Sequence, residues 1–140
     1  MFKKIMVPVD LAHTELLKPS LDLAADIAKL YQADTCYISV TANTPSSLAK
    51  TPEEYAQKLE AFAKEQGQLH GQKVSSKVIT SPDPVADMDD AILQAIDDTD
   101  ADLVIMTTHL PRRLDIVMPS NGSKVASHTD VSVFLVRHSD

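Results

Sequence analysis

The sequence predicts an α/β domain: a doubly wound, five-stranded parallel sheet with helices on both faces in a Rossmann-like arrangement. Apolar or β-branched runs alternate with amphipathic segments along the whole chain, and this alternation is typical of parallel sheets with right-handed crossovers. The length of 140 residues suits one domain with a substantial core. No internal repeat or linker interrupts the pattern, so we expect a single domain over residues 1–140.

The first strand is expected over 5–9, because IMVPV is an uninterrupted apolar run of the kind found in strands covered on both faces. Pro8 cannot donate a ladder hydrogen bond, so it is expected at the carboxyl end of that strand. Further strands are predicted over 35–40, 74–79, 103–106 and 131–136. The strand over 74–79 is less apolar and is therefore predicted nearer an edge of the sheet.

Helices are expected between these strands: over 19–31, from Thr51 to about Gly67, after Pro84, and from Ser120 or Asn121 to about His128. The second helix has the strongest start signal. Thr51 is a cap residue, Pro52 suits the first turn, and Glu54 follows the cap by three residues. Gly67 is predicted to mark the end of that helix.

The charge and cysteine content exclude several function classes. Lys and Arg number 13 against 20 Asp and Glu, and the net charge of −7 disfavours nucleic acid or anionic lipid as a partner. The single cysteine, Cys36, excludes an internal disulfide and a multi-cysteine zinc site. No apolar run approaches the roughly 20 residues that span a bilayer, and no targeting segment is visible. We therefore expect a cytoplasmic protein with no membrane partner.

A ligand site is expected at the carboxyl ends of the strands, where open parallel sheets bind ligands at the reversal of strand order. Asp10 follows the strand over 5–9, and residues 107–109 follow the strand over 103–106 in a loop that leads to the last helix. Free backbone N–H groups at the start of a helix favour an anion. Small or polar residues stand where that anion would rest: Ser120, Asn121, Gly122 and Ser123.

Several segments resemble the universal stress protein family. They are MVPVD near the start, DP before the third helix, ADLVIM into the fourth strand, and PSNGS leading to VSVFLVR. The match covers essentially the whole chain in the right order and spacing. The resemblance implies the strand order 3-2-1-4-5, a dimer formed through the last strand and, in many members, a pocket for ATP or AMP.

The resemblance also implies which residues would bind the nucleotide. Asp10 matches the aspartate that contacts the nucleotide or its metal, here Mg²⁺, and Val40 matches a position on the adenine side. The full candidate set is Asp10, Val40, Thr107, Thr108, His109, Arg112, Ser120, Asn121 and Gly122.

The phosphate loop departs from the family pattern. Thr107, Leu110 and Pro119 stand where nucleotide-binding members carry glycine. A threonine hydroxyl can donate to phosphate, whereas proline has no N–H and a fixed φ. The backbone of 120–122 could still cradle a phosphate, and the arginines at 112–113 could add charge-assisted bonds. A shorter loop followed by Ser-Asn resembles one subgroup that also binds nucleotide.

Three functions therefore remain open. The first is a stress-response or regulatory module that binds ATP or AMP, and the second is a dimeric, partner-binding module without nucleotide. The third is a weak ATPase, which the sequence disfavours because no base, nucleophile or metal set is recognisable. A homodimer is expected through the strand that begins at Val131 and ends at Val136, since its apolar edge would otherwise be exposed.

Individual side chains also have simpler interpretations. Asp10 is equally suited to cap the helix that follows it. His109 is interpreted as a surface histidine of the loop. His13 lies three residues after Asp10, a spacing that suits a metal pair only on a helix, and no third ligand is evident. Cys36, on a predicted strand, is interpreted as a small buried hydrophobe.

Overall fold

The computed structural model describes residues 1–109 and 121–138, the side chains of residues 85, 108–109, 121–123 and 138 excepted. The strands are β1 (Lys4–Pro8), β2 (Asp34–Ala42), β3 (Val74–Ser81), β4 (Leu103–His109) and β5 (Ser132–His138). The helices are the 3-10 helix η1 (Leu11–Leu17) and the α-helices α1 (Lys18–Tyr31), α2 (Pro52–His70), α3 (Pro84–Thr99) and α4 (Asn121–His128).

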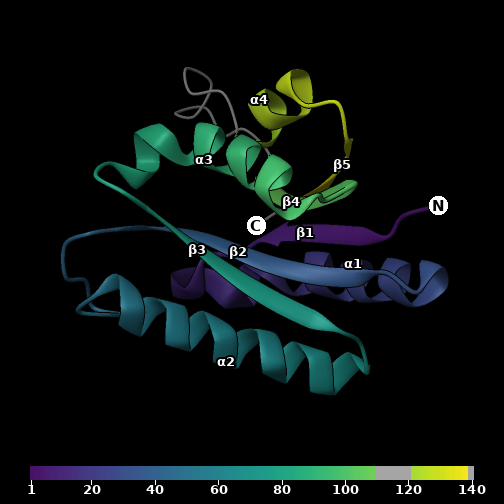
Figure 1. Ribbon diagram of the computed structural model, residues 1–140, viewed down its shortest axis with the longest axis horizontal. Helices are drawn as coiled ribbons and strands as arrows, with labels where there is room; N and C mark the ends of the chain where they lie inside the picture. Colours follow the sequence, from purple (N-terminus) through teal and green to yellow (C-terminus); the bar gives the residue numbers. More distant parts are fainter. Residues whose placement is uncertain (110–120, 139–140) are drawn as a thin grey trace.

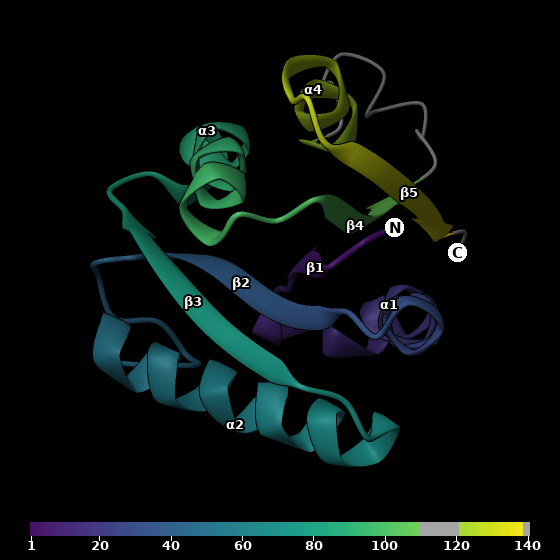
Figure 2. The ribbon, with the colours of Figure 1, turned by 45° about the vertical axis from the view of Figure 1, so that its right-hand side comes forward.

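The five strands form one sheet in the order β3-β2-β1-β4-β5, and every pairing is parallel. The predicted doubly wound fold and its strand order are thereby confirmed. Helices α1 and α2 cover one face, and α3 and α4 cover the other (Figure 1, Figure 2). The chain moves outward from β1 to β3 and then returns to β4 on the other side of β1, so strand order reverses between β1 and β4.

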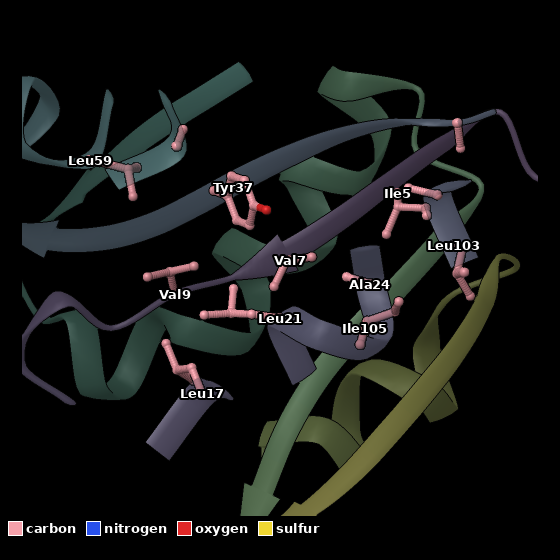
Figure 3. Packing of buried hydrophobic residues seen from close by; sticks show 13 residues of the cluster. Ile5, Val7, Val9, Leu17, Leu21, Ala24, Tyr37, Leu59, Leu103 and Ile105 are labelled. Carbon is pink, nitrogen blue, oxygen red and sulfur yellow. The ribbon is translucent and has the colours of Figure 1, made fainter. Parts of the chain in front are cut away.

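Two apolar cores lie on the two faces of the sheet. Ile5 and Val7 of β1 point to the face of α1 and α2, where they pack with Leu21 and Tyr37 (Figure 3). Met6, between them, belongs to the opposite core with residues of α3 and α4. Successive residues of a strand point to opposite faces, so a strand covered on both sides needs the uninterrupted apolar run seen at 5–9. Pro8 ends β1, as predicted.

Helix α2 begins as predicted but ends later. The Thr51 hydroxyl accepts a hydrogen bond from the Glu54 N–H at 3.1 Å and caps the first turn. The predicted stop near Gly67 is wrong, because the helix continues to His70 and ends at Gly71, whose φ of 65° is left-handed. Gly67 serves packing instead, since a Cβ there would lie 2.9 Å from Cγ2 of Val74 on β3.

The strands extend beyond their apolar runs, chiefly at their carboxyl ends. β3 continues to Ser81 and β4 to His109, although the apolar runs end at Ile79 and Met106. Polar residues therefore occupy the carboxyl ends of these two strands. None of the helices in the described part of the chain combines the length and the apolar character needed to cross a bilayer.

Candidate functional site

A cavity of about 510 Å³ opens at the carboxyl ends of β1, β2 and β4, where strand order reverses. Its apolar lining includes Ile38, Val40, Met88, Ile92 and Met106. Helix η1 supplies one wall and α3 supplies another. The volume is that of a small-molecule site, and its composition, apolar with a few polar groups, is typical of such sites.

Asp10 lies at the cavity as the N-cap of η1. Its Oδ1 accepts a hydrogen bond from the Ala12 N–H at 2.9 Å, and its Oδ2 lies 2.9 Å from Nδ1 of His13. The capping role foreseen for Asp10 is present, and the carboxylate still faces the cavity. Each carboxylate oxygen has a second lone pair, so the group can accept a further hydrogen bond from a ligand.

His13 also lines the cavity, although it is not among the site residues predicted from the sequence. The hydrogen bond and charge of Asp10 raise the pKa of His13 above its ordinary value of 6.5. Its backbone leaves the helical conformation, with φ −138° and ψ 45°. Among the described residues, no group of three His, Cys, Asp or Glu side chains is placed to hold a metal ion. Asp10 and His13 therefore form a hydrogen-bonded pair at the cavity wall, and the pair becomes an ion pair when His13 is protonated.

Thr107 lies in the carboxyl-terminal half of β4 and lines the cavity. Because β4 and β2 flank β1, Thr107 and Val40 line the cavity from opposite sides of β1. Its hydroxyl is hydrogen-bonded to the hydroxyl of Ser20, a buried residue of α1. Either oxygen can be the donor. When Ser20 donates, the hydroxyl hydrogen of Thr107 remains available to a ligand oxygen.

Ser39 of β2 lines the cavity next to β1. Its buried hydroxyl donates to the carbonyl oxygen of Val9 at 2.6 Å, and the Val9 N–H donates to the carbonyl of Ile38 at 2.7 Å. These two bonds prolong the β1–β2 contact past Pro8, which has no N–H of its own. The backbone of Val9 and the start of η1 are thereby fixed beside the cavity.

Tyr55 is a cavity residue that sequence reasoning missed. It lies in the early part of α2, and its side chain is buried at the cavity. Its hydroxyl oxygen accepts a hydrogen bond from the Leu11 N–H at 3.4 Å. Tyr55, Leu59 and Phe62 form an apolar stripe at helical spacing, which predicts that Tyr55 is buried. The sequence signal that could have placed it at the site is its position one turn into the helix that follows β2.

The structure brings together Asp10, Val40 and Thr107, which come from three different segments of the chain. Thr108 and His109 end β4, and Asn121 and Gly122 begin α4, but only their backbone is described. Arg112 and Ser120 lie outside the described residues, as do Leu110 and Pro119. Met88 also lines the cavity, although its helical spacing to Ile92 and Ile96 predicts a core position for it.

An all-parallel sheet whose strand order reverses beside a cavity defines this chain as a doubly wound α/β domain. The model of the universal stress protein family matches residues 1–137. The chain belongs to the universal stress protein family, which confirms the resemblance carried by its sequence motifs. No curated protein sequence matches it significantly.

Solved structures of the same family share the fold. A universal stress protein in complex with cAMP has a TM-score of 0.74 and 16% identity, over 96% of this chain and 97% of that chain. One from Archaeoglobus fulgidus in complex with dAMP has a TM-score of 0.67 and 18% identity, over 96% and 97% of the two chains. One from Arabidopsis thaliana with AMP bound has a TM-score of 0.65 and 16% identity, over 97% and 91%.

Proposed function

We propose that this chain is a regulatory module that binds an adenine nucleotide, AMP or ATP, in the cavity at the ends of β1, β2 and β4. The observation that carries the proposal is the convergence of Asp10, Val40 and Thr107 on one cavity. Family members of the same fold have been crystallised with cAMP, dAMP and AMP. Those complexes support a nucleotide as the ligand class.

The apolar part of the cavity suits an aromatic base. Val40, Met88 and Ile92 offer aliphatic and thioether surface, which packs favourably against a flat ring. Val40 follows the buried run of β2 and is itself only partly buried, so its side chain is available to a ligand. The base would therefore rest between β2 and α3.

The phosphate would lie on the β4 side. Thr107 can offer its hydroxyl hydrogen there when Ser20 donates to it. Helix α4 begins at Asn121, and free N–H groups at a helix start favour an anion. We assign the same role to the backbone and side chains of the remaining predicted residues, including Arg112 and Ser120.

Asp10 would accept a hydrogen bond from a ribose hydroxyl, since each of its oxygens retains a lone pair beyond the contacts with Ala12 and His13. The described residues contain no complete protein site for a metal ion. Mg²⁺ would therefore enter with the phosphates of ATP, as usual for this ion, with Asp10 contacting a metal-bound water.

The module would act as a homodimer. β5 is an edge strand, paired with β4 alone in the described sheet, and Phe134 on it is 46% exposed. An unpaired, apolar strand edge is a template for pairing with another chain. A second copy can satisfy that edge by placing its own β5 against it.

Isothermal titration calorimetry with AMP, and with ATP and Mg²⁺, tests the proposal. The wild-type chain should bind, and V40F should weaken binding at least about tenfold because the larger ring fills the cavity. T80F is the matched control, since Thr80 is exposed on the neighbouring strand β3 and lies outside the cavity. Absence of binding by the wild type at millimolar nucleotide would refute the proposal and favour a nucleotide-free, partner-binding module.

A further inference from the structure

Most polar groups of the cavity already have partners within the protein. The Ser39 hydroxyl hydrogen is donated to Val9, and the hydroxyls of Thr107 and Ser20 share one hydrogen bond. Asp10, when ionised, only accepts hydrogen bonds. Thr107 can offer its hydroxyl hydrogen on the β4 side only, so a ligand that presents an acceptor atom on the β2 side of the cavity needs a hydrogen-bond donor from another residue.

Tyr55 has such a donor. A phenolic hydroxyl has one hydrogen to donate and also accepts. In its contact with the Leu11 N–H, at 3.4 Å, the Tyr55 oxygen is the acceptor, so that contact does not use its hydrogen. None of the described residues accepts this hydrogen in a hydrogen bond. The side chain is only 6% exposed and lines the cavity, so a ligand is well placed to accept it.

The position of Tyr55 is fixed by the start of α2. Thr51 caps the helix through the Glu54 N–H, and the carboxylate of Glu54 accepts a hydrogen bond from the Lys50 N–H at 3.3 Å. Lys58, one turn later, donates to the carbonyl of Leu48 and ties the preceding loop to the helix. A side chain held in this way loses little further entropy when a ligand binds.

Tyr55 and Thr107 mark opposite sides of the cavity. Tyr55 contacts the first residue of η1, after β1, from α2 on the β2 side. Thr107 stands at the end of β4, on the other side of β1. With the phosphate on the β4 side, as in the proposed function, Tyr55 lies at the nucleoside end of the ligand.

We infer that Tyr55 is a specificity-determining residue, which donates its phenolic hydrogen to an acceptor atom of the nucleoside, a ring nitrogen or a sugar oxygen. This inference rests on the proposed function. According to this inference, Tyr55 of α2 contributes to ligand specificity in addition to Asp10 and Thr107. Ligands that lack an acceptor at that point would leave the buried hydroxyl hydrogen unpaired, which disfavours them.

Calorimetry with AMP on the wild type, Y55F and Y31F tests the inference. Y55F keeps the ring and its packing but removes the donor, so we expect about two- to tenfold weaker binding. Y31F is the matched control, because Tyr31 lies at the end of α1, outside the cavity, and its ring contacts Phe2. AMP analogues that each lack one acceptor, a ring nitrogen replaced by carbon or a hydroxyl by hydrogen, identify the atom.

The analogue that lacks the acceptor of the Tyr55 hydrogen should bind wild type and Y55F equally, because neither complex can form that hydrogen bond. A merely structural role of Tyr55 would weaken all the analogues in Y55F by the same factor, and that result would overturn the inference. Equal binding of AMP by Y55F and wild type would also overturn it, while leaving nucleotide binding intact. Failure of the wild type to bind any nucleotide would remove both the proposed function and this inference.

Discussion

The hydroxyl groups of Ser20 and Thr107 are hydrogen-bonded to each other, although 87 positions separate them in the chain. Ser20 is buried in the first turn of α1, and Thr107 lies near the end of β4 at the cavity. Thr107 stands where nucleotide-binding relatives are expected to carry glycine. Its added side chain therefore has a specific hydrogen-bond partner in Ser20.

The variant S20A should lower the free energy of unfolding by about 1 kcal/mol, because it removes one partner of a hydrogen bond at a buried site. Urea denaturation measures this change. Together with the single variant T107V and the double variant S20A/T107V, S20A forms a double-mutant cycle. The two effects should be less than additive, since each single change already breaks the same bond. Strict additivity would show that the two hydroxyls do not interact in solution.

The variant G67A should destabilise the fold by about 1 kcal/mol, as the net of a clash worth about 1–3 kcal/mol and a helix-propensity gain of about 1 kcal/mol. The added Cβ would lie 2.9 Å from Cγ2 of Val74 and 3.1 Å from the carbonyl oxygen of Gln72. Thermal denaturation measures the change. In a V74A background, G67A should destabilise the fold by a smaller amount, because the Val74 methyl groups are absent. An increase in stability caused by G67A would contradict the proposed packing role of Gly67.

The imidazole of His13 should titrate above its ordinary pKa of 6.5, because the Asp10 carboxylate stabilises the protonated ring. A raised folded-state pKa means that this interaction stabilises the fold below the unfolded pKa and is lost as pH rises through the folded one. Nuclear magnetic resonance of the ring protons follows the titration. D10N should lower the pKa of His13, whereas D34N, an exposed change elsewhere, should leave it unchanged. A His13 pKa that is insensitive to D10N would contradict the observed pair.

The chain should form a dimer at micromolar concentration through the edge of β5, as measured by light scattering coupled to size-exclusion chromatography. F134D should shift the equilibrium to monomer, because it places a charge on an apolar interface. L30D is the matched control, since Leu30 is an exposed apolar residue of α1 and is not part of β5. A wild-type monomer, or equal dissociation by both variants, would exclude an interface through β5.

The sequence predicted the alternation of elements because each strand and helix carries a local apolar period. The strand order came from resemblance, since local patterns do not specify which strands are neighbours. Asp10 and Thr107 were predicted at one site because the carboxyl ends of parallel strands meet at the same edge, whereas Val40 was predicted from the family resemblance. The parallel topology thus brings residues that are distant in the sequence together at one cavity.

What the sequence did not predict depends on contacts between distant segments. Gly67 resembled a helix stop, and only the close approach of Val74 on β3 explains a glycine inside α2. Tyr55 was recognised as a residue of the buried stripe, but a helical period does not reveal which buried residue faces a cavity. The partner of Thr107 on α1 was equally hidden, because side-chain hydrogen bonds across 87 positions leave no local pattern.

The most direct test of the central claim, that the cavity at the reversal of strand order binds an adenine nucleotide, is a crystal structure of the chain with AMP. We predict the base against Val40 and Met88, and the phosphate on the side of Thr107 and the first turn of α4. AMP bound elsewhere on the protein, with this cavity filled by side chains or solvent alone at saturating ligand, would contradict the account.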